Sequence, residues 1–379
     1  MKIDYSNRIF GLDVMRALAI LFVVGSHALW VFPSQDSAVF SLLRLAGVMG
    51  VEIFFVLSGF LIGRILLRLF TNPDFSSKDV LYFLTRRWFR TFPNYYLILL
   101  INIFIVIYIG RALPESLPLY FGFLQNGFSG MDIFFTESWS LPIEEVAYII
   151  GPVLLYLVLL PKWKLSKKYL FLLVTLVIIL FFLGMKVGYH VEHGATTLEF
   201  WNIELKAVVL YRIDAIYYGV LAAFISENLE KTWKKYRMEL FFLSLFFFAL
   251  LHIAIAAFGW GATTTPLFLN VLYLPLCSIC IAGTLPMFSL WRKAPRLIVK
   301  PLTFMSLISY AMYLLHYSII LQLMHYLIDV KNGTFYTVIF SVGYLTITIA
   351  LSTLLYVFYE KPMMDIRDRD FVKKLIYRN

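Results

Sequence analysis

Residues 11–32 read GLDVMRALAILFVVGSHALWVF, and this stretch decides how the rest of the chain is interpreted. As a helix it is about long enough to cross a hydrocarbon core of about 30 Å. It nevertheless carries Arg16 and His27. A charged or titratable side chain at membrane depth costs at least about 2.5 kcal/mol on insertion scales, so it mostly faces protein or water. Helical geometry places the two residues on one face, about 16 Å apart along the axis. We therefore predict a membrane helix with one polar stripe.

The composition supports a membrane protein. Of 379 residues, 61% are hydrophobic and only 15% are charged, against about 45–50% and about 25% in soluble domains. The apolar run begins after a short polar N-terminus and is followed by no small-residue cleavage pattern, so we expect no removable signal peptide. Cys277 and Cys280 both lie in an apolar run, which favours helix packing over a disulfide or a metal site.

Apolar runs of about 18 residues or more predict about ten transmembrane helices and no appended soluble domain. The fold class is thus an all-α, polytopic membrane protein with a single domain over residues 1–379. Of the 33 lysines and arginines, 26 fall in segments on one side and four on the other. This asymmetry predicts that both termini are cytoplasmic. The predicted spans are 11–32, 45–69, 92–110, 139–160, 169–188, 207–226, 240–258, 267–290, 303–327 and 335–359.

The net charge of +10 is spread over separate short loops. This pattern is typical of topology signals and of contacts with lipid headgroups, and it argues against a nucleic-acid partner. Membrane lipids are therefore the first expected partners. The sequence leaves the oligomeric state open.

Two segments on the predicted outer side differ from the other loops. Segment 111–138 is long, and it contains an aromatic run, YFGFLQNGF (120–128), that is too short to span the membrane but able to dip back into it. Segment 189–206 holds an H-x-E-H cluster that invites a metal-site interpretation, but without a further ligand in the segment a solvated loop is favoured. We therefore predict no metal. The cluster consists of His190, Glu192 and His193.

Polar residues in three predicted spans fall at one depth near the outer face. They are His27, the adjacent pair Glu144 and Glu145, and Arg212. Acid–base chemistry requires such a set: a histidine that accepts a proton from a hydroxyl and a carboxylate that orients the ring. The alternative is that glutamate and arginine neutralise each other between helices while His27 binds a backbone carbonyl. Several polar groups that are unfavourable in lipid occur at one depth, which favours the catalytic-site interpretation.

Further polar residues are candidates for supporting or substrate-binding roles. Glu52 and Ser58 lie deeper in the second predicted span, and Asp214 follows Arg212 in the sixth. In the ninth span, two share a polar stripe, for which a proton relay, a substrate contact or an interhelical hydrogen bond all fit, the last being favoured. The full supporting set is Glu52, Ser58, Arg212, Asp214, Tyr313 and His316.

Three arginines, Arg86, Arg87 and Arg90, precede the third predicted span on the cytoplasmic side. If this segment is helical, Arg87 and Arg90 share a face. Together with Arg16 they are suited to binding phosphate groups. A positive-inside anchor is the alternative interpretation. It leaves Arg16, inside the first span, unexplained.

Six segments occur in an order that resembles the acyltransferase family 3 membrane proteins, and they cover nearly the whole chain. Their residues go beyond what hydropathy alone predicts. They are LDVMRALAILFVVGSH (12–27), GVEIFFVLSGFLI (50–62), RRWFR (86–90), WSLPIEE (139–145), ISYAMYLLH (308–316) and YEKP (359–362).

This resemblance implies ten transmembrane helices in a bacterial cytoplasmic (inner) membrane. It also implies acyl transfer from cytoplasmic acetyl-coenzyme A to a hydroxyl of an extracytoplasmic sugar. By the same resemblance, His27 is the catalytic histidine, Arg16 its motif partner, Arg87 and Arg90 the arginine pair, and Glu144 the motif carboxylate. Members that modify peptidoglycan often carry an extra hydrolase-like domain. Its absence from this sequence points toward stand-alone members that act on lipopolysaccharide, exopolysaccharide, lipid-linked glycans or small glycosides.

The resulting prediction is an O-acetyltransferase that modifies polysaccharides or related glycans. Its catalytic residues are His27, Glu144 and Glu145, and its donor-binding residues are the four arginines above. His27, polarised by Glu144 or Glu145, is the expected general base. A covalent acyl-histidine is the less favoured variant. The competing class is a transporter or flippase that uses the intramembrane His, Glu and Arg residues as a relay.

Overall fold

The computed structural model describes residues 8–29, 32, 37–161, 164–328, 333–369 and 376–377, and the regular structure within these ranges is all helical. Residues 30 and 31 of the first predicted span, and the predicted loop lysines Lys162 and Lys331, lie outside them. The longer helices are α1 (Phe10–Ala28), α2 (Ala38–Thr71), α3 (Ser77–Tyr108), α5 (Ser140–Leu157), α6 (Lys167–His193), α8 (Ile213–Asn228), α10 (Arg237–Phe258), α11 (Leu274–Leu290), α12 (Arg296–Leu315) and α14 (Thr334–Leu355).

Shorter elements complete or connect these helices. Among the described residues, two are 3₁₀ turns and four are π-helical turns, in which the helix widens locally. The short α-helices are α4 (Leu117–Phe121), α7 (Leu198–Trp201), α9 (Glu230–Lys235), α13 (Gln322–Leu327) and α15 (Lys361–Arg367). The 3₁₀ turns are η2 (Thr136–Trp139) and η4 (Val209–Tyr211), and the π turns are η3 (Asn202–Lys206), η5 (Phe268–Tyr273), η6 (His316–Leu321) and η7 (Tyr356–Glu360).

Nine helical segments within the described ranges are long and apolar enough to cross a membrane, which confirms the all-α polytopic class. The sixth predicted span, 207–226, is not among these nine segments; it corresponds to α8, which has only 16 residues. At about 1.5 Å per residue, it is shorter than a full crossing of about 30 Å. The reason is local, because η3 and η4 occupy the chain just before α8.

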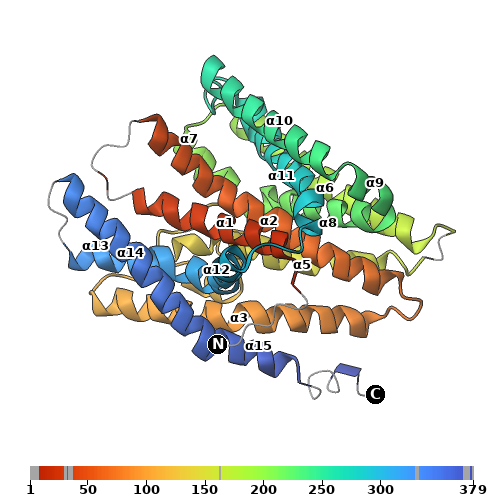
Figure 1. Cartoon of the computed structure of the whole chain (residues 1–379), viewed down its shortest axis with the longest axis horizontal. Helices are drawn as coiled ribbons and strands as arrows, with labels where there is room; N and C mark the ends of the chain where they lie inside the picture. Colours follow the sequence, from red (N-terminus) through yellow and green to blue (C-terminus); the bar gives the residue numbers. More distant parts are fainter. Residues whose placement is uncertain are drawn as a thin grey trace.

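The first two long helices form the centre of the bundle. Helix α2 packs against α1 and α8, and α1 also packs against α12. Figure 1 shows α1 and α2 in the middle of the molecule, with α10 along one edge and α3 along the opposite edge. Helix α10 packs on α11 and buries none of its own residues, as expected of a helix that faces lipid. His27 and Arg16 thus lie on a helix that has other helices packed against it.

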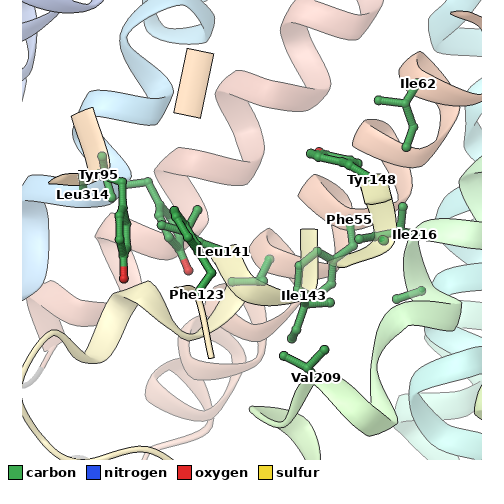
Figure 2. Close-up of a cluster of buried hydrophobic side chains, with 14 of the residues drawn as sticks. Phe55, Ile62, Tyr95, Phe123, Leu141, Ile143, Tyr148, Val209, Ile216 and Leu314 are labelled. Carbon is green, nitrogen blue, oxygen red and sulfur yellow. The ribbon is translucent and has the colours of Figure 1, made fainter. Parts of the chain in front are cut away.

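The main hydrophobic core joins the central helices to α5. Tyr95, Phe123 and Leu314 lie at one end of it, and Phe55 and Ile216 lie at the other (Figure 2). All five side chains are buried. This core fixes α2, α3, α5, α8 and α12 relative to one another. These helices supply most of the candidate site.

Helix α3 begins well before the predicted span 92–110. Ser76 and Asp79 form a capping box, with the Ser76 N–H donating to Asp79 Oδ2 at 2.9 Å. Such reciprocal caps satisfy the free N–H groups of the first helical turn. The predicted boundary was therefore wrong, because a charged but well-capped segment extends the helix toward its N-terminus. The arginine segment 86–90 is helical as a result.

The predicted boundary of the fifth span, 169–188, was also too short. Helix α6 continues to His193. Lys186, one of the four basic residues assigned to the predicted outer side, is buried within this helix. In segment 111–138, Phe123 adopts a left-handed φ of 56° and stacks on Tyr95 with ring centroids 4.1 Å apart. The Asn126 side-chain amide donates to the Trp139 carbonyl at 2.7 Å. This segment therefore packs against the helix bundle.

Candidate active site

A cavity that is partly open to solvent lies between α1, α2, α3, α5 and α12. Three arginines and a single glutamate line it, so the ionised side chains give it an excess of positive charge. Such a site suits a ligand with several negative charges. Six of the residues predicted from sequence line this one cavity: Arg16, Ser58, Arg87, Arg90, Glu144 and Tyr313.

Arg16 is held loosely at the cavity wall. Its Nη1 lies 3.9 Å from Asp13 Oδ1 and 3.3 Å from Ser306 Oγ. Asp13 accepts closer hydrogen bonds from other groups, at 2.8 Å from Arg8 Nε and at 2.8 Å from the Ser306 hydroxyl. Asp13 thus ties the start of α1 to α12 and leaves much of the Arg16 charge available to the cavity. Sequence reasoning did not single out Asp13, although it lies in the quoted motif.

Arg87 and Arg90 reach the cavity from α3, one turn apart. The Arg87 guanidinium lies 4.6 Å from the centroid of the Tyr148 ring. Its Nε is buried and has no hydrogen-bond partner among the described residues. A buried donor without an acceptor is costly, and an anionic ligand in the cavity is the kind of group that would satisfy it.

Arg86, the fourth predicted arginine, does not line this cavity. Its Nη2 lies 2.9 Å from Asp368 Oδ1, and its Nη1 donates to the Tyr82 hydroxyl at 3.2 Å. Hydrogen bonds from Arg367 and the charge of Arg86 hold the pKa of the Asp368 carboxyl below its usual value. Arg86 therefore ties the segment after α15 to α3, on another face of the helix.

His27 lies in the last turn of α1 and contacts His316. The Nδ1 atom of His27 is 2.9 Å from the Val23 carbonyl oxygen and 3.2 Å from His316 Nε2. His316 Nδ1 is in turn 2.7 Å from the Tyr313 carbonyl oxygen. The two histidine rings meet edge to face, with centroids 4.9 Å apart.

These contacts assign the protons of the neutral histidine pair. A carbonyl oxygen only accepts hydrogen bonds, so Nδ1 of both His316 and His27 carries a proton. His316 Nε2 is then an acceptor facing the N–H of His27. In this tautomer the basic nitrogen of His27 is Nε2. The arrangement matches a histidine base whose ring is oriented through its other nitrogen.

The two predicted carboxylates of α5 have different surroundings. Glu144 lines the cavity, accepts a hydrogen bond from the Tyr148 hydroxyl, and lies 3.5 Å from the Ser58 hydroxyl. Glu145 is buried and does not line the cavity. His27 therefore meets His316 and the ring of Tyr317, whose centroid is 4.9 Å from that of His27, whereas Glu144 belongs to the arginine end of the cavity.

Three predicted residues form buried ion pairs outside the cavity. Arg212 bonds Glu52, which also accepts from the Ser278 hydroxyl at 3.1 Å. Asp214 pairs with Lys186 of α6. These pairs neutralise charge between helices, which is the alternative that the sequence left open for the Glu and Arg residues.

Lys206, which the sequence did not single out, lies at the end of η3 near the same ion pairs. Its Nζ is 5.4 Å from the centroid of the Trp139 ring. Burial and the nearby Arg212 charge lower its pKa to about 8.

The predicted outer histidine cluster is dispersed. His193 stacks on Tyr189, and His190 Nδ1 lies 3.4 Å from the Asn270 amide nitrogen. Within the described ranges, no group of three or more His, Cys, Asp or Glu side chains is placed to hold a metal ion.

Comparison with known proteins places this site in a family. A family profile described as an acyltransferase domain matches residues 9–357. The chain is 32% identical over 169 residues to the putative peptidoglycan O-acetyltransferase YrhL of Bacillus subtilis, covering 41% of this chain and 25% of YrhL. It is 32% identical over 177 residues to the peptidoglycan O-acetyltransferase OatA of Listeria monocytogenes, covering 42% of this chain and 26% of OatA.

A eukaryotic protein is also similar. The regulator of hypoxia-inducible factor 1 of Caenorhabditis elegans is 28% identical over 222 residues, which cover 50% of this chain and 41% of that protein. No solved structure matches the chain. The aligned segments amount to only about a quarter of the length of the two bacterial relatives. The family profile, in contrast, spans nearly the whole chain, and the protein therefore belongs to the acyltransferase family 3 of membrane proteins.

Proposed function

We propose that this protein is a membrane O-acyltransferase that moves an acyl group, acetyl in the first instance, from cytoplasmic acyl-coenzyme A to a hydroxyl of an extracytoplasmic or lipid-linked glycan. One observation carries this proposal. The cavity extends from three arginines to Tyr313, whose ring lies 5.8 Å from that of His316, the partner of His27. The names of two relatives, both peptidoglycan O-acetyltransferases, support acetyl transfer to a glycan.

The arginine end of the cavity fits the nucleotide of the donor. Coenzyme A carries anionic phosphates at one end and its thioester at the end of a long, thin arm. Arg16, Arg87 and Arg90 would hold the phosphates, with the buried Arg87 Nε among the donors. Arg16 and His27 are eleven residues apart on α1, or about 16 Å. The arm would extend over this distance and bring the thioester to the histidine pair.

His27 would act as the general base in the transfer. Its Nε2 removes the proton of the acceptor hydroxyl while that oxygen attacks the thioester carbonyl carbon. The resulting tetrahedral intermediate collapses with breakage of the carbon–sulfur bond, and the thiolate of coenzyme A takes the proton back from His27. The imidazolium formed in between donates through Nδ1 to His316 Nε2 and the Val23 carbonyl, which keep the ring in place.

Replacing Arg90 with alanine should weaken coenzyme A binding. A charge-assisted hydrogen bond contributes about 1.5–3 kcal/mol, so its loss predicts a roughly 10- to 100-fold higher dissociation constant. Isothermal titration calorimetry of coenzyme A with the purified protein in detergent measures this effect directly. The Michaelis constant for the acyl donor should rise with it.

Arg86→Ala is the matched control, because Arg86 lies on the same helix but bonds Asp368 outside the cavity. We expect it to leave the coenzyme A affinity unchanged. Equal weakening in the two variants, or a lower protein yield with unchanged affinity in Arg90→Ala, would make Arg90 a topology anchor instead of a donor ligand.

The direct test of the function is coenzyme A release from acetyl-coenzyme A by the purified protein in liposomes, with and without a crude envelope-glycan fraction. Release that requires the glycan, together with radiolabelled acetyl on the glycan, would support acyl transfer. A protein that neither binds nor turns over the donor, but moves a supplied glycan across the membrane, would be a transporter or flippase.

A further inference from the structure

A buried glutamate outside the cavity contacts the element that carries His316. Glu137 lies in η2, just before α5, and its residue is only 4% exposed. Its Oε1 accepts two hydrogen bonds from Ser318, one from the backbone N–H at 3.1 Å and one from the hydroxyl at 2.6 Å. Glu137 thereby links η2 to η6 across 181 residues of sequence.

Ser318 belongs to η6, the π turn that starts at His316. Single π turns inside α-helices are rare, and they occur frequently at functional sites. The ninth predicted span is helical on both sides of this turn, in α12 and α13. The backbone position at which His316 leaves the helix therefore depends on what holds the turn in this form.

A buried glutamate at this position is energetically unfavourable. Its second carboxylate oxygen, Oε2, is buried and has no hydrogen-bond partner among the described residues. Burying a partly satisfied carboxylate disfavours folding relative to an apolar side chain of similar size. Stability alone therefore does not explain why a glutamate occupies this position. Its role as a hydrogen-bond acceptor for the Ser318 N–H and hydroxyl does explain it.

We propose that Glu137 is a positioning residue for acyl transfer, which fixes the π turn through Ser318 and thereby holds His316 Nε2 against His27 Nδ1. This inference rests on the function proposed above. It extends the site by a residue that lies outside the cavity and acts on the histidine pair through Ser318. The contacts run from Glu137 to Ser318, along η6 to His316, and from there to His27.

Two substitutions of Glu137 distinguish the effect of its hydrogen-bond acceptor from the effect of its negative charge. Glu137→Gln keeps an oxygen at the position of Oε1, so we expect turnover close to that of the wild type. Glu137→Leu keeps the volume but removes the acceptor. A small displacement of a catalytic group can cost about 100-fold in rate, so we expect turnover per folded molecule to fall by roughly 10- to 100-fold with an unchanged Michaelis constant for the donor. Glu239→Leu, at an exposed glutamate of α10, is the matched control.

Imidazole nitrogen-15 spectra give a readout that does not depend on activity. The chain has only six histidines, so His316→Ala assigns the signals of His316. We expect Glu137→Leu to shift these signals, and Glu137→Gln and Glu239→Leu to leave them in place. If Glu137→Leu does not fold, Ser318→Ala removes one of the two hydrogen bonds and should shift the same signals to a smaller extent.

The possible failures are distinguishable. Unchanged His316 signals in Glu137→Leu, or in Ser318→Ala if only that variant folds, would overturn the positioning role. Normal turnover per folded Glu137→Leu molecule would overturn it as well. A wild-type protein that shows no acyl transfer, but whose His316 signals respond as expected, would contradict the proposed function and leave the structural link from Glu137 to His316 standing.

Discussion

Replacing His27 with alanine is expected to lower acceptor-dependent coenzyme A release by about 10²- to 10⁴-fold, which is the usual contribution of a general base. His27 Nδ1 donates toward Val23 and His316, so its Nε2 is the nitrogen that takes the hydroxyl proton. Coenzyme A affinity should be unchanged, because Arg16 lies about three turns away along α1, and Arg87 and Arg90 lie on α3. Steady-state release assays and calorimetry on the same preparation measure both quantities.

His252→Ala is the matched control for this experiment. His252 lies on α10, away from the cavity, and its Nδ1 is 2.8 Å from the carbonyl oxygen four residues earlier, as in His27. We expect normal turnover in this variant. Turnover of His316→Ala should lie between those of His27→Ala and His252→Ala, because this substitution removes the residue that orients His27 but not His27 itself. Full acceptor-dependent release by His27→Ala would exclude His27 as the base and assign that role to another residue.

The helices could largely be predicted from the sequence, because hydropathy reports which segments can be buried in lipid. The predicted helices are wrong where features other than hydropathy determine a helix end or a local turn. Helix α3 begins at Ser77 through a capping box that the S-x-x-D pattern of residues 76–79 encodes, in a segment too charged to count as a span. The π turn η6 has no comparable sequence signal, because it depends on contacts such as that with Glu137.

The sequence predicted which polar residues lie inside the helix bundle, but not which of them meet. It grouped His27, Glu144 and Arg212 by depth, and all three lie in the bundle, but Glu144 lies with the arginines of the cavity and His27 lies against His316. Their partners depend on the rotation and packing of each helix, which depth does not specify. Glu144 therefore meets Tyr148 and the arginine cavity, while Arg212 meets Glu52. The sequence therefore predicts an approximate depth for a residue in a membrane helix, whereas its neighbours are decided by tertiary contacts.

Arg212→Met is expected to prevent stable folding, although Arg212 lies outside the cavity. Both Arg212 and Glu52 are completely buried, and Glu52 keeps only the Ser278 hydroxyl as a close partner when the guanidinium is removed. Breaking a buried ion pair by removing one partner costs about 3–5 kcal/mol. This is a large share of a total stability of about 5–15 kcal/mol. Size-exclusion profiles and apparent melting temperatures in detergent should show little folded protein.

The double variant Glu52→Gln with Arg212→Met should recover much of this loss, since it leaves no unpaired charge in the bundle. Arg64→Met is the exposed control. Arg64 bonds Glu227 at 2.7 Å, with both side chains nearly 30% exposed and Arg68 also in contact with Glu227, so its loss should cost at most about 1 kcal/mol. If Arg212→Met folds normally but loses acyl transfer, the pair is part of the catalytic machinery. If the double variant is as unstable as the single one, the guanidinium stabilises the bundle through its packing over Phe55 and not through neutralisation of Glu52.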